Sequence, residues 1–440
     1  MDVTVQKVFI VGLGYVGLPL AILARSKDYD VIGVDLDTQK VGKIQSGITP
    51  FTDNEVSKLL KRHPISAQSN YANIELANII IVCVPTPVDE AFMPDLSIVE
   101  SVCNEIGSRL QKGQLIIIES TINPGVCDDV IIPILERTSK MKCGSDFYLA
   151  HCPERINPGD SSWNVSNIPR VVGANDASSL KKSVTFYESI ISGSIKPMAT
   201  IKEAEAVKVV ENSFRDINIA FVNELAMSFS MLGIDVVNVI DGAATKPFAF
   251  MPHYPGAGVG GHCIPVDPYY LIEYAKSKGF THRFLSVARE INNGMPLFVL
   301  QRFMEALVEN KTKTKGMQIT VLGLSYKPNV GDLRESPALR IVSLLSDEYS
   351  KVTVYDPYID NTFKSFSHLK NIEIIDTKNN LTAALKGSKA IIIATAHKEF
   401  LHMNYQELAV NGIEIIVDGR NCLDKQKVQA AGILYKGIGR

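Results

Sequence analysis

The sequence predicts an α/β protein with two Rossmann-like doubly wound domains joined by a long central helix. Three observations favour this fold. Apolar runs of strand length alternate with helical patterns in both halves of the chain, a glycine-rich turn joins the first strand to the first helix, and residues 200–232 contain neither proline nor glycine. Because 440 residues are too many for one hydrophobic core, we expect three domains, at 1–199, 200–312 and 313–440.

The first strand is predicted at residues 7–11, directly before a G-x-G-x-x-G turn and a helical pattern. The turn comprises Gly12, Gly14, Tyr15, Val16 and Gly17. Glycines there permit a tight turn and close approach of a pyrophosphate to a helix N-terminus. The second strand ends at Asp35, about 20 residues beyond the glycines, where a carboxylate binds a ribose diol. The pattern favours an NAD site over a bare structural turn, and the acid disfavours NADP.

Further strands are predicted at 78–84, 115–119 and 147–150, with helices at 96–110 and after Pro124. Ligands of parallel sheets bind beyond the carboxyl ends of the strands. Thr86, Thr121 and Glu154 fall at those ends, so we expect them where cofactor and substrate meet. Each has a structural alternative: the threonines as helix caps or turn residues, and Glu154 as a solvated charge in a turn.

The helical pattern at 200–232 is predicted to connect domains and to form a subunit contact, so we expect a homodimer or a higher homo-oligomer. Lys208 and Asn212 lie four residues apart and share one helix face. Lys208 is alternatively a surface lysine whose stem covers apolar side chains. The polar run 311–316 is predicted to be a linker.

A second α/β pattern follows, with strands predicted at 318–323, 351–356, 390–394 and 413–418. The strand that ends at Asp356 parallels the one that ends at Asp35, which indicates a duplicated fold. The later glycines of the fingerprint are absent, so we do not expect a second dinucleotide bound in the same way. Lys327, Arg334 and Arg420 lie at or just after strand ends and suit a diphosphate, or they are ordinary surface cations.

The glycine-rich loop 256–268 carries the strongest candidate nucleophile, Cys263. Glycines on one side let the backbone approach a ligand, and prolines on the other side restrain it. His262 and Asp267 place ionisable groups near the thiol, as in reactive sites. The alternative is a buried cysteine beside a tight turn.

Composition excludes several functions. The formal net charge is −2, which does not favour nucleic acid or an anionic membrane as a partner. The seven cysteines form no Cys-x-x-Cys pair, which argues against a zinc site and a disulfide framework. No metal is expected. The absence of a targeting segment or a long apolar run favours a cytoplasmic protein.

The chain resembles the UDP-glucose/GDP-mannose dehydrogenase family, NAD-dependent enzymes that oxidise the primary alcohol of a nucleotide sugar twice. The resemblance covers almost the whole chain. It rests on the segments 12–17, 84–87, 119–121, 153–155, 208–224, 260–268, 331–336 and 418–420.

The resemblance implies a site. Cys263 corresponds to the nucleophile, with Lys208, Asn212 and Asp267 around the reacting carbon, and Thr121 and Glu154 correspond to residues that position water and move protons. Cofactor contacts are implied for Gly12, Gly14, Tyr15, Val16, Gly17, Asp35, Thr86, Thr121 and Arg334. Substrate contacts are implied for Glu154, Arg155, Lys208, Asn212, Arg215, Gly260, Lys327 and Arg420.

The sugar is expected to be a UDP-N-acetylhexosamine, used in surface polysaccharide biosynthesis. Members that act on UDP-glucose usually carry Pro-Glu-Phe-Leu and Gly-Tyr-Cys, whereas this chain has Pro-Glu-Arg-Ile and Gly-His-Cys. Arg155 or Arg215 would donate to the acetamido carbonyl, or would instead hold a structural carboxylate such as Asp216. The run 244–248 resembles the N-acetylglucosamine enzymes, so we expect UDP-N-acetylglucosamine ahead of UDP-N-acetylmannosamine, UDP-N-acetylgalactosamine or UDP-glucose.

Two rival functions remain at this point. A β-hydroxyacid dehydrogenase shares the first fingerprint but needs neither the loop cysteine nor a third domain, and it forms one NADH per substrate where the family forms two. A non-catalytic NAD-sensing protein would keep the fold and lose the chemistry.

Overall fold

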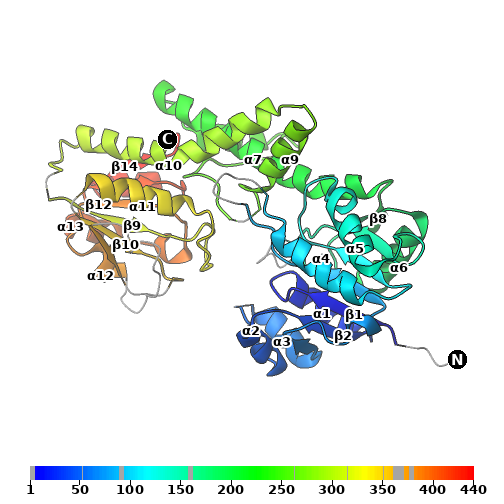
Figure 1. Cartoon of the computed structure of the whole chain (residues 1–440). Coiled ribbons are helices and arrows are strands. Elements are labelled where there is room, and N and C mark those ends of the chain that lie inside the picture. Colours follow the sequence, from blue (N-terminus) through cyan, green and yellow to red (C-terminus); the bar gives the residue numbers. More distant parts are fainter. Residues whose placement is uncertain are drawn as a thin grey trace. The chain divides into compact units, whose positions relative to one another are not determined.

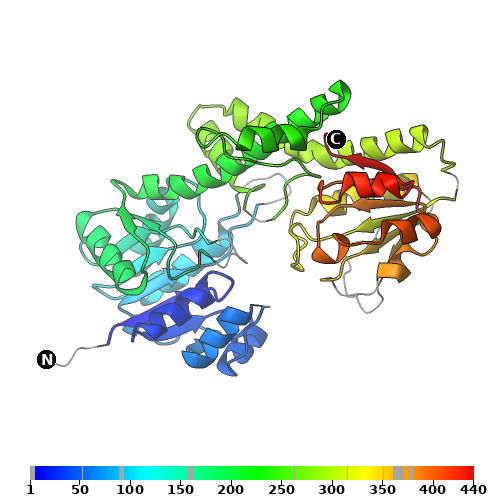
Figure 2. The ribbon, with the colours of Figure 1, turned by 180° about the vertical axis from the view of Figure 1, so that it is seen from behind.

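A computed structural model describes residues 5–51, 53–88, 94–156, 162–261, 263–314, 316–349, 351–359, 371–375 and 381–440. The chain forms two compact units (Figures 1 and 2). The first contains Met1–Glu211 and Tyr269–Phe280, and the second contains Asn212–Pro268 and Thr281–Arg440. His262, beside the candidate nucleophile, lies outside the described residues.

The first unit is built on an eight-stranded sheet. Its strands run in the order β3-β2-β1-β4-β5-β6-β7-β8, and all neighbours are parallel except the antiparallel pair β6–β7. Their bounds are β1 (Lys7–Val11), β2 (Asp30–Val34), β3 (Ser66–Gln68), β4 (Ile79–Val82), β5 (Leu115–Ile118), β6 (Tyr148–His151), β7 (Arg170–Ala174) and β8 (Ile195–Pro197). The chain changes direction across the sheet between β1 and β4, where open α/β folds bind their ligands.

Helices cover both faces of this sheet (Figure 1). They are α1 (Gly17–Ser26), α2 (Thr38–Gln45), α3 (Asn54–Arg62), α4 (Ser97–Arg109), α5 (Ile132–Ser139) and α6 (Ala177–Ile190), with short turns at Ile74–Leu76 and Cys127–Ile131. Because β4 and β5 are buried along their whole length, their side chains point into apolar clusters on both faces. Their uninterrupted isoleucine and valine runs are typical of such strands.

The predicted long helix is confirmed as α7 (Ile201–Leu232). It is followed by α8 (Val236–Ala244), α9 (Asp267–Ser277) and α10 (Arg283–Glu309), which contains Pro296. Among the described helices, none combines the length and apolarity needed to cross a membrane.

The second unit contains the duplicated fold that the sequence predicts. Its six strands are parallel in the order β11-β10-β9-β12-β13-β14, with bounds β9 (Gln318–Leu322), β10 (Lys351–Tyr355), β11 (Ile372–Ile374), β12 (Ala390–Ile393), β13 (Ile415–Asp418) and β14 (Leu434–Gly437). The helices are α11 (Pro337–Glu348), α12 (Leu381–Leu385), α13 (Tyr405–Val410) and α14 (Lys425–Ala430), with a short turn at Lys398–Phe400. Residues of α10 and α11 share one apolar cluster with this sheet, so these helices cover one of its faces (Figure 1).

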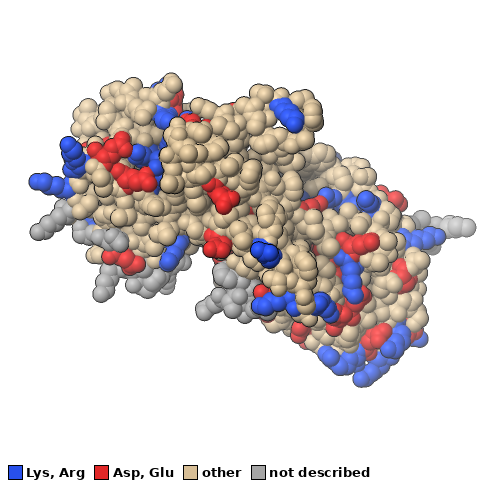
Figure 3. Space-filling model, turned by 90° about the horizontal axis from the view of Figure 1, so that it is seen from above, with Lys and Arg blue, Asp and Glu red and all other residues tan. Residues whose placement is uncertain are grey.

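Charged side chains of both signs are interspersed on the face drawn in Figure 3, where neither sign forms a continuous field. This pattern agrees with the small net charge of the chain.

Candidate active site

The glycine turn between β1 and α1 has the geometry that a dinucleotide requires. Gly12 has a φ of 94°, and a Cβ atom there would lie 2.6 Å from the carbonyl oxygen of Cys83. A Cβ on Gly17 would lie 1.9 Å from the carbonyl oxygen of Gly12, whereas one on Gly14 would have no described atom within 4 Å. The first and third glycines therefore permit close backbone packing, and the second leaves room for a pyrophosphate at the helix N-terminus.

Tyr15 and Val16 complete this turn. The Tyr15 ring is half exposed and stacks on Phe51, with ring centroids 4.2 Å apart. Val16 is the residue before α1, and its side chain makes no capping hydrogen bond. The helix therefore begins with backbone N–H groups that no side chain of its own caps, as in helices whose N-terminus binds an anion.

Asp35 follows β2 and lies beside the glycine turn. One carboxylate oxygen accepts hydrogen bonds from the Leu13 amide at 2.9 Å and from Lys40 Nζ at 2.7 Å, and the other accepts from the Asp37 amide at 3.1 Å. The acid is thus held at the end of β2, where a ribose is expected. Sequence reasoning missed Lys40, although a lysine five residues past the acid, in the first turn of α2, was a visible signal.

Thr86 and Thr121 lie after the adjacent strands β4 and β5. The Thr86 hydroxyl donates to the Thr121 carbonyl at 2.6 Å, and the Thr86 carbonyl accepts from the hydroxyl of Tyr270. Ser120 Oγ donates to the Val84 carbonyl at 2.7 Å. These bonds tie the two strand ends together at the edge of the sheet where the ligand is expected.

Glu154 follows β6 at the same edge and is nearly buried. One of its carboxylate oxygens accepts the backbone amides of Arg155 and Ile156, and the other lies 3.2 Å from the guanidinium of Arg170. Arg170 also donates to Glu119 at 3.1 Å, and its side chain is completely buried. Glu154 is therefore not the solvated turn charge that the sequence left as an alternative.

Of the two arginines proposed for an acetamido group, Arg155 has partners within its own unit. Its guanidinium pairs with Glu211 and donates to the Pro169 carbonyl at 2.9 Å. Arg215 is exposed on α7. The structural-carboxylate alternative thus describes the contacts of Arg155, although the carboxylate is Glu211 rather than Asp216.

Cys263 lies half buried in its loop. Burial raises the pKa of Cys83, Cys103, Cys127, Cys143, Cys152 and Cys422, with values of about 12 for Cys103, Cys143 and Cys152. Since the thiolate is the nucleophilic form, those six are poorly suited to attack a carbonyl. The raised pKa values argue against these six as the nucleophile, and Cys263 stays the candidate that its loop sequence indicates.

Asp267 opens α9 four residues after Cys263 and is buried. Its backbone amide donates to the Cys263 carbonyl at 2.8 Å, and its carboxylate accepts from Asn212 Nδ2 at 2.5 Å. Within the second unit, the fold therefore joins Asn212 of α7 to the loop of the cysteine. Lys208, half buried one turn earlier on α7, belongs to the first unit together with Thr121 and Glu154.

A chain of buried amides fixes the start of this loop. Asn223 of α7 accepts from the Gly256 amide at 3.0 Å and donates to Asn292 of α10 at 2.8 Å. Asn292 in turn donates to Asp216, which pairs with Arg289 at 2.6 Å. Sequence reasoning missed this chain, because the residues that bond to each other are 33 to 76 positions apart and nothing in the local pattern links them.

The three cations predicted for a diphosphate have different surroundings. Arg420 is tied to backbone carbonyls, at 2.8 Å to Ala394 and at 3.4 Å to Gly258 of the cysteine loop. Arg334 pairs with Asp332, and its carbonyl accepts from the Gly261 amide at 2.9 Å. Lys327 is half buried on the loop after β9.

The loop after β9 also explains why residue 260, in the loop of Cys263, is a glycine. A Cβ on Gly260 would lie 2.7 Å from both the Glu335 carbonyl oxygen and Tyr326 Cβ. Only glycine permits the two loops to pack this closely.

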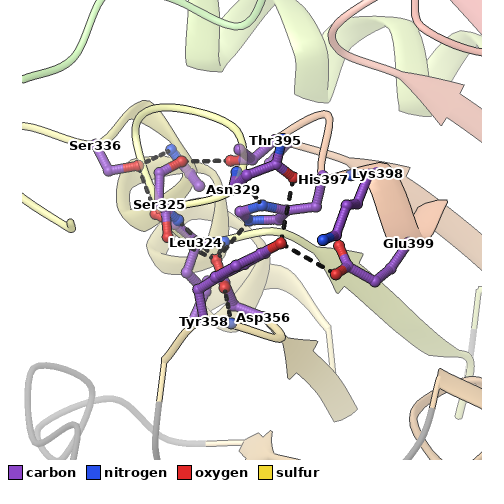
Figure 4. A network of polar contacts seen from close by, with 12 residues as sticks. Leu324, Ser325, Asn329, Ser336, Asp356, Tyr358, Thr395, His397, Lys398 and Glu399 are labelled. Carbon is purple, nitrogen blue, oxygen red and sulfur yellow. Dashed lines mark hydrogen bonds and ion pairs between the residues drawn. The ribbon is translucent and has the colours of Figure 1, made fainter. Parts of the chain in front are cut away.

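A buried acid pins the loop after β9 (Figure 4). Asp356 Oδ2 accepts from the Leu324 amide, from the amide and hydroxyl of Ser325, and from His397 Nε2 at 3.0 Å. His397 Nδ1 accepts from the Asn329 amide at 2.8 Å, which fixes the neutral ring with its proton on Nε2. Asp356 occupies the position that corresponds to Asp35. Its carboxylate accepts hydrogen bonds from within the protein, so it does not have the role of a ribose ligand.

Among the described residues, no group of three or more His, Cys, Asp or Glu side chains is arranged to hold a metal ion.

Three protein-family models match the chain. They are the NAD binding domain of the UDP-glucose/GDP-mannose dehydrogenase family at residues 6–191, its central domain at 202–294 and its UDP binding domain at 320–425.

Individual proteins of known name are similar to almost the whole chain. A UDP-N-acetyl-D-glucosamine 6-dehydrogenase of Pseudomonas aeruginosa is 36% identical over 96% of this chain and 98% of its own length. A UDP-N-acetyl-D-mannosamine dehydrogenase of Pyrococcus horikoshii is 35% identical over 99% of each chain. The solved structure of a UDP-D-ManNAc dehydrogenase from Pyrococcus horikoshii superposes with a TM-score of 0.89 at 34% identity and covers 99% of both chains. The glycine turn, the acid beyond β2 and the loop cysteine thus occur in a chain that belongs to the UDP-glucose/GDP-mannose dehydrogenase family and carries its NAD-binding, central and UDP-binding domains.

Proposed function

We propose that the protein is an NAD-dependent UDP-N-acetylhexosamine 6-dehydrogenase that oxidises a primary alcohol to a carboxylate through a covalent intermediate on Cys263. The observation that carries the proposal is the placement of Cys263. It is the candidate nucleophile among seven cysteines, and its loop is bonded to Asp267, to α7 and to the loop after β9. A simple two-electron alcohol dehydrogenase needs no such cysteine, so the loop favours the four-electron reaction.

The proposed reaction has two oxidations and one hydrolysis. Two NAD molecules, held in turn by the Gly12–Gly17 turn and Asp35, would supply the hydride acceptors for the two oxidations. The first oxidation turns the alcohol into an aldehyde and releases a proton. The Cys263 thiolate adds to the aldehyde carbon as a thiohemiacetal, and loss of the second hydride leaves a thioester. Water then attacks the thioester carbonyl, the C–S bond breaks, and the carboxylate leaves as the thiol is restored.

The remaining roles follow from the donors and acceptors present. Asn212 gives one amide hydrogen to Asp267, and we propose that its second donates to an oxyanion. Lys208 supplies a positive charge for the same purpose. One such donor contributes on the order of 3–4 kcal/mol to a transition state. Glu154, with help from Thr121 or Asp267, would take the proton from the attacking water.

For the sugar, we propose UDP-N-acetylglucosamine. The Pseudomonas aeruginosa relative named for this sugar supports the proposal, but the relative named for UDP-N-acetyl-D-mannosamine is almost as similar. Because Arg155 has structural partners, the proposal keeps Arg215 as the donor to the acetamido carbonyl. Lys327, Arg334 and Arg420 are proposed for the nucleotide side, where the match to a UDP-binding domain supports a uridine diphosphate.

We also propose the domain division 1–199, 200–312 and 313–440, a cytoplasmic location, a role in surface polysaccharide biosynthesis and a homodimer. The three matched family models support the division. The dimer is supported by exposed apolar side chains on α7, such as Phe214 and Phe221, which are 47% and 53% exposed. Sedimentation of the wild type at micromolar concentration should give a dimer, and Phe221→Glu should give a monomer. A wild-type monomer would refute the dimer.

The function is tested by NADH formation with UDP-N-acetylglucosamine, UDP-N-acetylmannosamine, UDP-N-acetylgalactosamine and UDP-glucose at equal concentrations. We expect the highest kcat/KM for UDP-N-acetylglucosamine and two NADH per sugar. A preference for UDP-glucose would refute the sugar assignment. One NADH per sugar would refute the four-electron reaction.

A further inference from the structure

We propose that Arg170 is a positioning residue for Glu154, and that Glu119 sets the basicity of Glu154 by competing for Arg170. The proposal rests on the role given to Glu154 above. It identifies three further residues, Arg170, Glu119 and Tyr187, that tune the hydrolytic step without touching the substrate.

Arg170 is the centre of the cluster. It begins β7 and its side chain is completely buried. A guanidinium does not lose its proton inside a protein, so it must be balanced by carboxylates. NH1 donates to Glu119 at 3.1 Å, and NH2 lies 3.2 Å from Glu154. One positive charge is thus shared between two carboxylates that come from the ends of different strands.

Glu119 has a second partner on its other oxygen. The Tyr187 hydroxyl, on α6, donates to Glu119 Oε1 at 2.5 Å, and the Arg170 guanidinium lies 5.6 Å from the centre of the Tyr187 ring. Burial raises the pKa of Glu119, while Arg170 and the Tyr187 hydroxyl oppose that rise. Glu119 is therefore fully used inside the protein and is not placed to act on substrate.

Glu154 is held differently. Its Oε1 accepts two backbone amides, and within the described structure its buried Oε2 accepts no aligned hydrogen bond although Arg170 NH2 is close. The ion pair holds this oxygen beside Arg170, so the charge of Arg170 acts directly on the carboxylate of Glu154.

The other titratable groups around Glu154 do not supply a competing charge. Cys83 of the β4 end and Cys152 of the β6 end share the cluster, and burial raises the pKa of both thiols, so they stay neutral. His151, at the end of β6, has a pKa lowered to about 3 by burial and is also neutral. Arg155 and Glu211 balance each other at the edge of the site.

The charges of Arg170, Glu119 and Glu154 predict how replacement of Glu119 should change the pH–rate profile. When both carboxylates are ionised, the cluster carries a net charge of −1, and each carboxylate weakens the hold of Arg170 on the other. Glu119→Gln removes the competitor and keeps its volume. Arg170 is then paired with Glu154 alone, so the acid limb of the pH–rate profile should move to lower pH.

The test measures the rate of uronate release against pH in single turnovers with UDP-N-acetylglucosamine and NAD. Glu119→Gln should shift the acid limb to lower pH. It should also lower the maximal rate at the plateau, because a weaker base activates water less well. Tyr187→Phe should shift the limb in the same direction by less, since Glu119 then loses a donor and takes up a proton more readily. Tyr29→Phe is the matched control, because it removes a hydroxyl that contacts Ser189 of the same helix α6 rather than a charged residue of this cluster.

The double variant separates a tuning role from a merely structural one. Tyr187 acts through the charge of Glu119, so Glu119→Gln with Tyr187→Phe should shift the limb no further than Glu119→Gln alone. Thermal unfolding of every variant identifies any that fail to fold, and the smaller Tyr187→Phe change tests the idea if Glu119→Gln does not fold.

Glu154→Gln distinguishes failure of this proposal from failure of the proposed function. If Glu154→Gln slows uronate release but neither Glu119→Gln nor Tyr187→Phe moves the limb, the tuning role is refuted and the function stands. If Glu154→Gln has no effect, the role given to Glu154 is refuted, and this proposal with it.

Discussion

Replacement of Asp35 by serine should open the cofactor site to NADP. Asp35 carries the negative charge expected beside the ribose, and its carboxylate already binds Lys40 at 2.7 Å. Serine keeps a hydroxyl that can accept the Leu13 amide. The change therefore removes a repulsive charge and frees a lysine that is already in place, so that no cation needs to be introduced.

The size of the effect follows from the charges. Asp35 and Lys40 are 11% and 27% exposed, so they interact in an environment between water and protein interior. Two unit charges 4 Å apart interact by about 4 kcal/mol at the effective dielectric constant of about 20 typical near a protein surface. A 2′-phosphate near Asp35 meets a penalty of that order, which corresponds to about a thousandfold in affinity.

The assay compares kcat/KM for NADP and for NAD in the wild type, in Asp35→Ser and in Asp35→Ser with Lys40→Ala. The single variant should raise the NADP-to-NAD ratio by two to three orders of magnitude, and the double variant should lose most of that gain. Asp37→Ser is the control, because Asp37 caps α2 and serine caps equally well. An unchanged ratio in Asp35→Ser, or a wild type that uses NADP as readily as NAD, would refute the assignment of Asp35.

Two further predictions concern the second unit. Asn223→Ala leaves the Gly256 amide and Asn292 without their buried partner, so it should lower the free energy of unfolding by about 1–3 kcal/mol and reduce kcat more than it raises KM. Asn218→Ala removes a half-buried side chain that donates to the Phe214 carbonyl of the same helix, and it should do neither. His397→Ala removes a hydrogen-bond donor from Asp356. Burial alone would raise the pKa of this carboxyl, but His397 and backbone amides hold the pKa below its usual value of 3.8. The ionised Asp356 therefore stabilises the folded wild type above about pH 3.8, and this stabilisation is lost as the pH falls below that value. The unfolding temperature of His397→Ala should begin to fall at a higher pH than that of the wild type. Parallel pH profiles for variant and wild type would contradict this.

Most of the fold follows from pattern alone. Runs such as Ile79–Val82 and Ala390–Ile393 are too apolar for anything but buried strands, and α7 lacks any residue that would end it. The sequence did not reveal β7. Its first residue is Arg170, and a local pattern does not distinguish a buried arginine from a surface one when its partners are 16 and 51 residues away. The antiparallel pairing of β7 with β6 was missed for the same reason.

The candidate site was predictable where chemistry is local in sequence. The glycine turn, Asp35 and the loop of Cys263 are readable because a few adjacent residues define them. The residues that hold them in place are not: Lys40, Asn223 and Asn292 become partners only when helices pack. Arg155 shows the opposite problem, since its position in a motif suggested a ligand contact while the fold gives it Glu211.

The most direct test of the proposed mechanism is mass spectrometry of the Cys263 peptide after rapid quenching. Glu154→Gln should slow hydrolysis and allow the acyl-enzyme to accumulate during a single turnover with UDP-N-acetylglucosamine and NAD. We predict a mass increase on the peptide that contains Cys263 equal to the uronyl nucleotide bound as a thioester, and no such adduct in Cys263→Ser, which should also form no uronate. Uronate formation by Cys263→Ser at the wild-type rate, with no adduct on Cys263 in any variant, would contradict a covalent mechanism.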